Sequence, residues 1–213
     1  MMRFTDRLDA ARQLSKKLEA VSREKPVVLA LPRGGVPLGL EIARTYQLPL
    51  DVILSKKIGH PLYPEFAIGA LAEDGDPLVN SYQKKNLDEE WLTHEIESIR
   101  QQIADRRGMY DKVLKKQDLR NRSVILIDDG IATGMTMKAA IESVRKQEAA
   151  TVTVAVPVIP KDTYHELVKL ADRVIAVDVP EVFLGAVGAY YGKFNQVSDR
   201  EVIRMLKSST QKS

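Results

Sequence analysis

Asp128 and Asp129 are adjacent carboxylates that stand between an apolar run and a segment rich in glycine and threonine. The apolar run, residues 124–127, reads Val-Ile-Leu-Ile and is typical of a strand buried on both faces. Two adjacent carboxylates at the end of such a strand can accept hydrogen bonds from two neighbouring hydroxyl groups of a sugar. The sequence therefore predicts that this acid pair binds a sugar.

Residues 130–136 follow the acids and read Gly-Ile-Ala-Thr-Gly-Met-Thr, and a helix is expected directly after them. Backbone N–H groups at a turn and helix start can hold a phosphate, helped by the helix dipole. Thr133 and Thr136 add hydroxyl donors, while Gly130 and Gly134 permit close backbone approach and positive φ. The pattern favours a phosphorylated sugar as ligand; a buried strand followed by an acidic turn in solvent is the alternative. The order of residues excludes a Walker A loop and a phosphatase-type Asp-x-Asp.

Segment 124–136 resembles the phosphoribosyl-pyrophosphate (PRPP) motif of type I phosphoribosyltransferases, and all thirteen positions fit. The resemblance implies that Asp128 and Asp129 orient the ribose, and that these two carboxylates are indirect ligands of the Mg²⁺ ion bound with PRPP. It also implies that the 5′-phosphate sits on Gly130, Ile131, Ala132, Thr133, Gly134, Met135 and Thr136.

Two further segments at predicted strand ends carry basic residues. Arg33, Gly34 and Gly35 follow the first strand and resemble the pyrophosphate loop of the same family, where the peptide is sometimes cis without proline. A plain turn is the alternative for this segment. Lys56 and Lys57 are expected to end the second strand, and the resemblance favours a basic residue near the pyrophosphate. Because adjacent strand residues face opposite ways, at most one of them is expected to point into the site, and two solvated lysines are the alternative.

The resemblance also implies a mobile lid over PRPP and a hood that stacks on the base. The stretch 108–121 is the candidate lid, with Arg107 reaching the pyrophosphate; a charged helix face in solvent is the alternative. Phe183 is the candidate for stacking on the base, with Leu184 beside it, and core packing is the alternative for the aromatic ring.

Enzymes of this family that act on 6-oxopurines carry three polar groups that read the base. At the corresponding positions this chain has Ala132 in the phosphate loop, Val156-Pro157-Val158 at the end of the next strand, and Tyr190 in the hood. Lys161 lies a few residues beyond the strand. The resemblance therefore implies that hypoxanthine and guanine are not the acceptors.

The bulk composition is that of an ordinary globular protein. The 213 residues are 44% hydrophobic and 29% charged, with a formal net charge of +3 and no cysteine. Basic residues are scattered among acids, so no nucleic-acid partner is expected. No apolar window approaches the length of a membrane span and the first residues are too polar for a signal peptide, so we expect a cytoplasmic protein without a membrane partner.

Predicted strands alternate with predicted helices, which is typical of a doubly wound parallel sheet in an α/β fold. Strands are expected at 26–31, 50–54, 124–127, 151–156 and 173–177, with helices at 5–22 and 36–46. A hairpin is expected around Asp74-Gly75-Asp76. A long amphipathic helix is expected from the apolar stripe Leu92, Ile96, Ile99, Ile103, Tyr110 and Leu114. In such sheets ligands bind at the carboxyl ends of the strands, near a topological switch point.

We therefore expect one phosphoribosyltransferase-like domain over residues 1–213. It would comprise a core at about 24–178, a hairpin and long-helix insertion at about 60–120, and a C-terminal hood at about 178–207. The implied reaction transfers 5-phosphoribosyl from PRPP to a nitrogenous base or other nitrogen nucleophile, with Mg²⁺ as cofactor, PRPP and a small-molecule base as partners, and a homo-oligomer, a dimer, as the assembly. A non-catalytic PRPP-sensing regulator is the alternative, and a PRPP synthase-like protein is a third.

Overall fold

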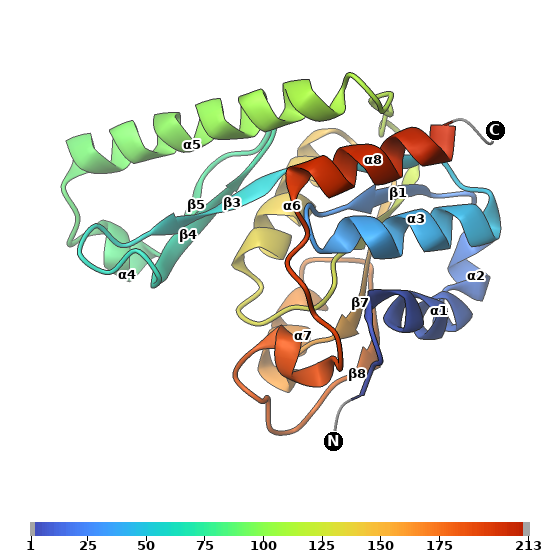
Figure 1. The fold of residues 1–213 in the computed structure, drawn as a ribbon. Helices are drawn as coiled ribbons and strands as arrows, with labels where there is room; N and C mark the ends of the chain where they lie inside the picture. Colours follow the sequence, from blue (N-terminus) through green and yellow to red (C-terminus); the bar gives the residue numbers. More distant parts are fainter. Residues whose placement is uncertain (1–2, 211–213) are drawn as a thin grey trace.

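The structure is a computed structural model that describes residues 3–210, with side chains up to Ser208. The elements in chain order are α1 (Arg7–Lys17), α2 (Glu19–Ser22), β1 (Val27–Ala30), α3 (Gly35–Tyr46), β2 (Leu50–Val52), β3 (Ser55–Gly59), β4 (Ala67–Ala72), β5 (Leu78–Val79), α4 (Ser81–Lys84), α5 (Glu89–Tyr110), β6 (Ser123–Ile127), α6 (Met135–Lys146), β7 (Thr151–Val158), α7 (Lys161–Leu167), β8 (Arg173–Asp178), the 3₁₀ helix η1 (Val187–Tyr190) and α8 (Asp199–Thr210) (Figure 1).

Five parallel strands form the central sheet in the order β2-β1-β6-β7-β8. Alternate side chains of each strand enter different cores, because successive residues of a strand point to opposite faces. On one face, Leu29 and Leu126 pack in a core that includes residues of α6 and α7; on the other, Val28 and Ile125 pack in a core with residues of α1 and α3. The predicted α/β fold with a doubly wound parallel sheet is confirmed.

A second, antiparallel sheet of β3, β4 and β5 projects from the central sheet, and the 22-residue helix α5 runs along it (Figure 1). The predicted hairpin around residues 74–76 is present between β4 and β5. Ile58, Leu71 and Ile99 belong to one buried cluster, so the second sheet and α5 share a core, and this core also includes Val52 of β2 and Val202 of α8.

The prediction that Lys56 and Lys57 end the second strand of the main sheet is wrong. That strand stops at Val52, and the two lysines lie in β3 of the antiparallel sheet, where they pair with Leu71 and Ala70 of β4. The physical reason is that the chain changes sheets after Leu54, so that Ile58 can be buried against α5 and β4 instead of extending the central sheet.

Local signals set several helix boundaries. The Asp6 side chain caps α1 by accepting hydrogen bonds from the N–H groups of Leu8 and Asp9. The single helix expected over 5–22 is interrupted at Leu18, which separates α1 from α2. Helix α8 is an addition to the predicted elements; Val202, buried in the core with α5, is on its inner face.

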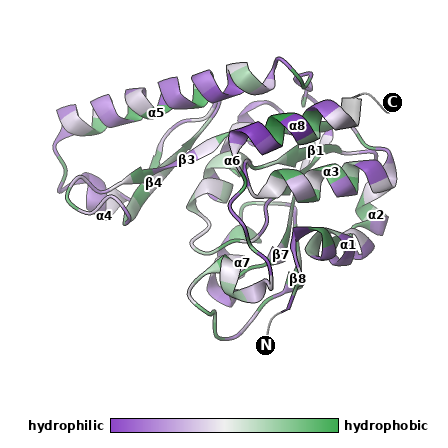
Figure 2. Ribbon diagram, in the orientation of Figure 1, coloured by the Kyte–Doolittle hydropathy of each residue, from purple (hydrophilic) through white to green (hydrophobic). Residues whose placement is uncertain are grey.

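Hydrophobic residues concentrate on the central strands and on the helix faces turned toward them, whereas α5 is hydrophilic over most of its length with hydrophobic residues at intervals (Figure 2). Within residues 3–210, no helix combines the length and the apolarity that crossing a bilayer requires.

Candidate functional site

The loops after β1 and β6 meet at the carboxyl edge of the central sheet. β1 lies between β2 and β6, so the chain reverses direction across the sheet at this point, and ligands of doubly wound folds bind at such switch points. The loops touch: Leu31 N donates to Ile127 O at 2.8 Å. A Cβ on Gly34 would lie 2.0 Å from Asp129 Oδ2, and one on Gly35 would lie 2.4 Å from Ile127 O. The two glycines therefore permit a contact that any side chain would prevent.

The acid pair sits in the wall between these loops. Asp128 Oδ1 accepts a hydrogen bond from Asp129 N at 2.8 Å, which holds the first carboxylate against the backbone of the second. Burial raises the pKa of Asp128 well above its usual range, and the charge of Asp129 adds to that rise. Burial also raises the pKa of Asp129, against the opposing effect of Arg7. Both carboxylates therefore have little contact with water, and hydrogen bonds from the hydroxyl groups of a ligand would stabilise their charged forms.

Two residues far away in the chain reach Asp129, and the sequence predicts neither contact. The Arg7 guanidinium contacts Asp129 Oδ2 through Nε and through Nη2, each at 2.8 Å. The Tyr191 hydroxyl donates to the Asp129 carbonyl oxygen at 2.6 Å. The first helix and the segment after η1 thus both support the acid pair.

The predicted phosphate loop leads into α6, and the residue that caps this helix has a left-handed backbone conformation. Gly134 has φ +73° and caps α6, whose first turn has N–H groups without intrahelical partners. Ile131 is buried and its N–H donates to Val158 O at 2.9 Å. The Ala132 carbonyl accepts from Thr163 Oγ1 at 3.0 Å, while Thr133 is exposed. Thr136 is half-buried in the first turn of α6. The loop is thereby anchored to the end of β7 through Val158 and to α7 through Thr163.

Arg33 lies beside a second guanidinium in a network around Asp199, at the start of α8. The Pro32–Arg33 peptide is cis. Arg33 Nη1 is 3.7 Å from Asp199 Oδ2, and Arg106 Nε is 3.5 Å from Asp199 Oδ1. The Tyr110 hydroxyl donates to the same Oδ1 at 2.5 Å. Two guanidiniums thus share one carboxylate, which favours an added anion at this place.

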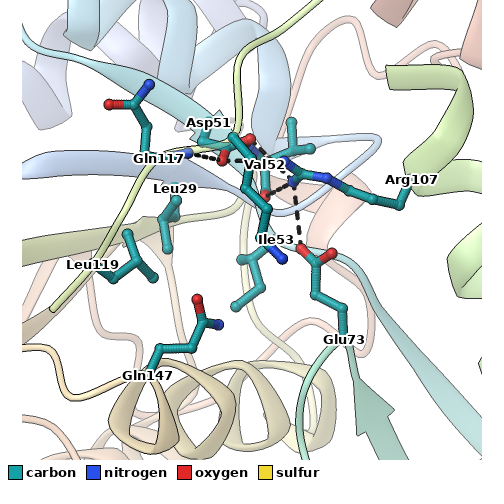
Figure 3. Close-up of a pocket in the computed structure, with 10 residues that line it drawn as sticks. Leu29, Asp51, Val52, Ile53, Glu73, Arg107, Gln117, Leu119 and Gln147 are labelled. Carbon is teal, nitrogen blue, oxygen red and sulfur yellow. Dashed lines mark hydrogen bonds and ion pairs between the residues drawn. The ribbon is translucent and has the colours of Figure 1, made fainter. Parts of the chain in front are cut away.

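Arg107, the guanidinium expected at the pyrophosphate, is engaged elsewhere. It is buried against β2, where Nη1 and Nη2 donate to the Asp51 carboxylate at 3.0 and 3.2 Å and Nη1 also donates to Val52 O (Figure 3). Glu73 lies 3.5 Å away and Asp111 2.7 Å away. A contact with pyrophosphate would require this buried cluster to open, and the side chain found beside Arg33 is that of the neighbouring Arg106.

The same cluster holds one carboxylate with a displaced pKa. Burial raises the pKa of Glu73 to about 7. The positive charge of Arg107 acts to lower this pKa, but Arg107 is also paired with Asp51 and Asp111, and the effect of burial is larger. Glu73, Asp51 and Arg107 line a cavity of about 10 Å³, room for a single water (Figure 3).

The remaining predicted residues lie at the margins. Lys56 and Lys57 are exposed, and Lys56 Nζ donates to Gln102 Oε1 on α5. Phe183 stacks on Tyr190 with ring centroids 5.4 Å apart, and Leu184 is exposed, its N–H donating to the Tyr190 hydroxyl at 3.0 Å.

The hood contacts the motif through Val187. A Cβ on Gly130 would lie 2.5 Å from Val187 Cγ1, so this part of the hood packs on the phosphate loop. The structure therefore brings Val187 of the hood next to the candidate phosphate loop, while Phe183 packs on Tyr190 and against the core cluster of α1 and α3.

The protein supplies few ligands for a metal ion here. In residues 3–210 no three His, Asp or Glu side chains are grouped so as to hold one. Mg²⁺ commonly uses one or two carboxylates together with substrate phosphates and waters. The pair Asp128 and Asp129 fits an ion that arrives with a diphosphate, and not a site built by protein alone.

Comparison with known proteins identifies the family. The phosphoribosyl transferase domain model matches residues 5–191. Two curated proteins from Mycobacterium tuberculosis strains, each named "Putative phosphoribosyl transferase" (MT0597 and Rv0571c), are 39% identical over 212 residues, which is 97% of this chain and 47% of each protein. The chain thus spans about half the length of the curated relatives it matches. The crystal structure of TT1426 from Thermus thermophilus is 40% identical, with a TM-score of 0.83 over 97% of this chain and 99% of that one.

This chain belongs to the phosphoribosyl transferase domain family. The predicted resemblance is confirmed, including a branch in which the relatives' names give no substrate.

Proposed function

We propose that the protein is an enzyme that transfers a 5-phosphoribosyl group from PRPP to a nitrogen nucleophile, with release of pyrophosphate. One observation carries the proposal: adjacent carboxylates, Asp128 and Asp129, lie at a sheet switch point between a glycine pair that touches them and a helix start capped by Gly134. Family membership supports the same chemistry.

In this proposal each part of PRPP meets a different element. Asp128 and Asp129 accept hydrogen bonds from the ribose hydroxyls, and residues 130–136 hold the 5′-phosphate at the start of α6. Arg33 lies where the pyrophosphate departs, and Arg106 beside it adds a second positive charge. Fixing the sugar and neutralising the leaving group are the contributions that a dissociative group transfer needs from a protein.

Mg²⁺ is proposed as the cofactor. When bound with PRPP it would neutralise diphosphate charge, and Asp128 and Asp129 are the protein groups beside which it would lie. Lys56 and Lys57 stay proposed pyrophosphate contacts, since both side chains are exposed and long enough to move.

The acceptor is proposed to be a base other than hypoxanthine or guanine. Lys161, which follows the strand end where the family reads a 6-oxo group, is paired with Glu181 at 2.6 and 2.8 Å. Ala132 offers no polar side chain in the loop. A 6-oxopurine would leave polar groups unpaired, at about 1–3 kcal/mol for each group.

The experiment is a screen of free bases that measures PRPP-dependent pyrophosphate release with and without Mg²⁺. We expect release with at least one base and none with Asp128→Asn/Asp129→Asn. PRPP binding without turnover of any nitrogen nucleophile would favour the non-catalytic sensor, and no PRPP binding would overturn both functions. The single-domain organisation, the dimer and the cytoplasmic location stay predictions.

A further inference from the structure

Arg7 approaches the acid pair from a part of the chain that the family motif does not include. It is the first residue of α1, and it lies 122 positions before Asp129 in the sequence. Both side chains are 13% exposed, and Nε and Nη2 converge on one carboxylate oxygen, Oδ2, at 2.8 Å. Charge-assisted contacts of this length in a site short of water are strong and directional.

The Arg7 guanidinium is also held on its other sides. Its central carbon lies 3.9 Å from the centre of the Phe194 ring, and Nη1 donates to Asn195 O at 2.7 Å. The base of the side chain is fixed because Asp6 caps α1, and because the backbone N–H groups of Arg3 and Phe4 donate to Tyr190 O. A planar guanidinium stacked on a ring and bonded at each end can hold its partner in one orientation.

The acid pair needs such a partner. Two neighbouring carboxylates with little solvent repel each other, and a ligand that donates hydroxyl hydrogens to both requires both to face it. In the structure, Asp129 is paired with the Arg7 guanidinium of α1, and Asp128 accepts a hydrogen bond from the backbone N–H of Asp129.

We infer that Arg7 is a positioning residue of the PRPP site, which holds the Asp129 carboxylate in the orientation that receives the ribose. Arg7 acts through Asp129 and does not touch the substrate. The inference rests on the proposed function, and it links α1 and the segment at 194–195 to ribose binding.

A double-mutant cycle on PRPP affinity tests this role. Calorimetry with PRPP and Mg²⁺ is done on the wild type, Arg7→Gln, Asp129→Asn and the double variant. We expect Arg7→Gln to weaken binding by about tenfold or more in the wild-type background, and by less than about twofold when Asp129 is already Asn. Arg7→Lys should recover part of the affinity, because it keeps the charge but not the contacts with Phe194 and Asn195. Arg12→Gln, 65% exposed on the same helix, is the matched control and should bind as the wild type does.

The outcomes separate the two proposals. Failure of the wild type to bind PRPP overturns the proposed function and this inference with it. Binding by the wild type with unchanged affinity in Arg7→Gln overturns the inference alone. So does an equal loss in both backgrounds, since that pattern means that α1 merely supports the fold. If circular dichroism shows that Arg7→Gln is unfolded, the cycle is run with Arg7→Lys, for which a loss of about threefold is expected, again only in the presence of Asp129.

Discussion

Substituting Gly34 by alanine adds a single methyl group at the point where the two loops meet. The added Cβ would lie 2.0 Å from Asp129 Oδ2, whereas real Cβ atoms essentially never come closer than 3.0 Å to a neighbour. The backbone of Gly34 is helical, with φ −63° and ψ −35°, so alanine is acceptable there on conformational grounds. The effect of the substitution is therefore steric, and it falls on the Asp129 carboxylate.

The size of the effect follows from the two contacts that Arg7 makes with Asp129 Oδ2. A displacement of about 1 Å or more takes Asp129 Oδ2 out of hydrogen-bond range of Arg7, since both contacts are now 2.8 Å long. Hydrogen bonds to charged groups contribute about 1.5–3 kcal/mol each, and alanine returns about 0.5–1 kcal/mol of conformational entropy. We expect Gly34→Ala to lower the free energy of unfolding by about 2–5 kcal/mol, and PRPP affinity to fall by at least about tenfold.

Gly108 provides the matched control. It lies in α5, and a Cβ there would meet nothing within 4 Å. Gly108→Ala should therefore raise the free energy of unfolding, by about 0.5–1 kcal/mol, and leave PRPP affinity unchanged. Urea denaturation and calorimetry measure both variants. If Gly34→Ala matched Gly108→Ala in stability and bound PRPP as the wild type does, the contact between the two loops would not exist in solution.

Three further predictions concern other parts of the molecule. Burial raises the pKa of Glu73 to about 7, so its stabilising contribution is complete below the unfolded value of 4.5 and is lost as pH rises to 7. Glu73→Gln should thus be more stable than the wild type at pH 8.5, by up to roughly 3 kcal/mol, with little difference at pH 4.5; equal urea midpoints at pH 8.5 would count against a buried, proton-binding Glu73. Hydrogen exchange with and without PRPP and Mg²⁺ locates the lid. The stretch 108–121 is the sequence-based candidate, but the burial of Tyr110, Leu114 and Leu119 counts against its opening, so we expect PRPP to protect the exposed loop 60–66 instead; protection confined to 108–121 would reverse that choice. Adenine, orotate or uracil should be used with a higher kcat/KM than hypoxanthine or guanine, and the opposite order would refute the interpretation of Ala132.

The motif region was predictable because its signals are local. Four buried residues, two acids and a glycine-containing turn determine a strand, a loop and a helix start without help from distant segments, and β6 and α6 appear where expected. The partners of the motif were not predictable in this way. Arg7 and Tyr191 meet Asp129 only through tertiary packing, and nothing near them in the sequence identifies that contact.

Two differences between the structure and the predictions had readable signals in the sequence. Arg107 falls four residues after Ile103 and eight after Ile99, on the apolar stripe of α5, so the helix turns it into the core and leaves Arg106 to face Asp199. Helix α8 carries buried Val202 and Leu206 at helical spacing. The passage from β2 to β3 had no such signal, because no glycine or proline marks the change of sheet between Val52 and Ser55.

The most direct test of the central claim is the calorimetric titration of PRPP with Mg²⁺ into the wild type and into Asp128→Asn/Asp129→Asn. If the two carboxylates hold the ribose, each lost charged hydrogen bond removes about 1.5–3 kcal/mol from the binding free energy of PRPP. The double variant should therefore bind PRPP at least about tenfold more weakly, while its cooperative thermal unfolding shows that it is still folded. Equal affinity in the wild type and the folded double variant would contradict the site.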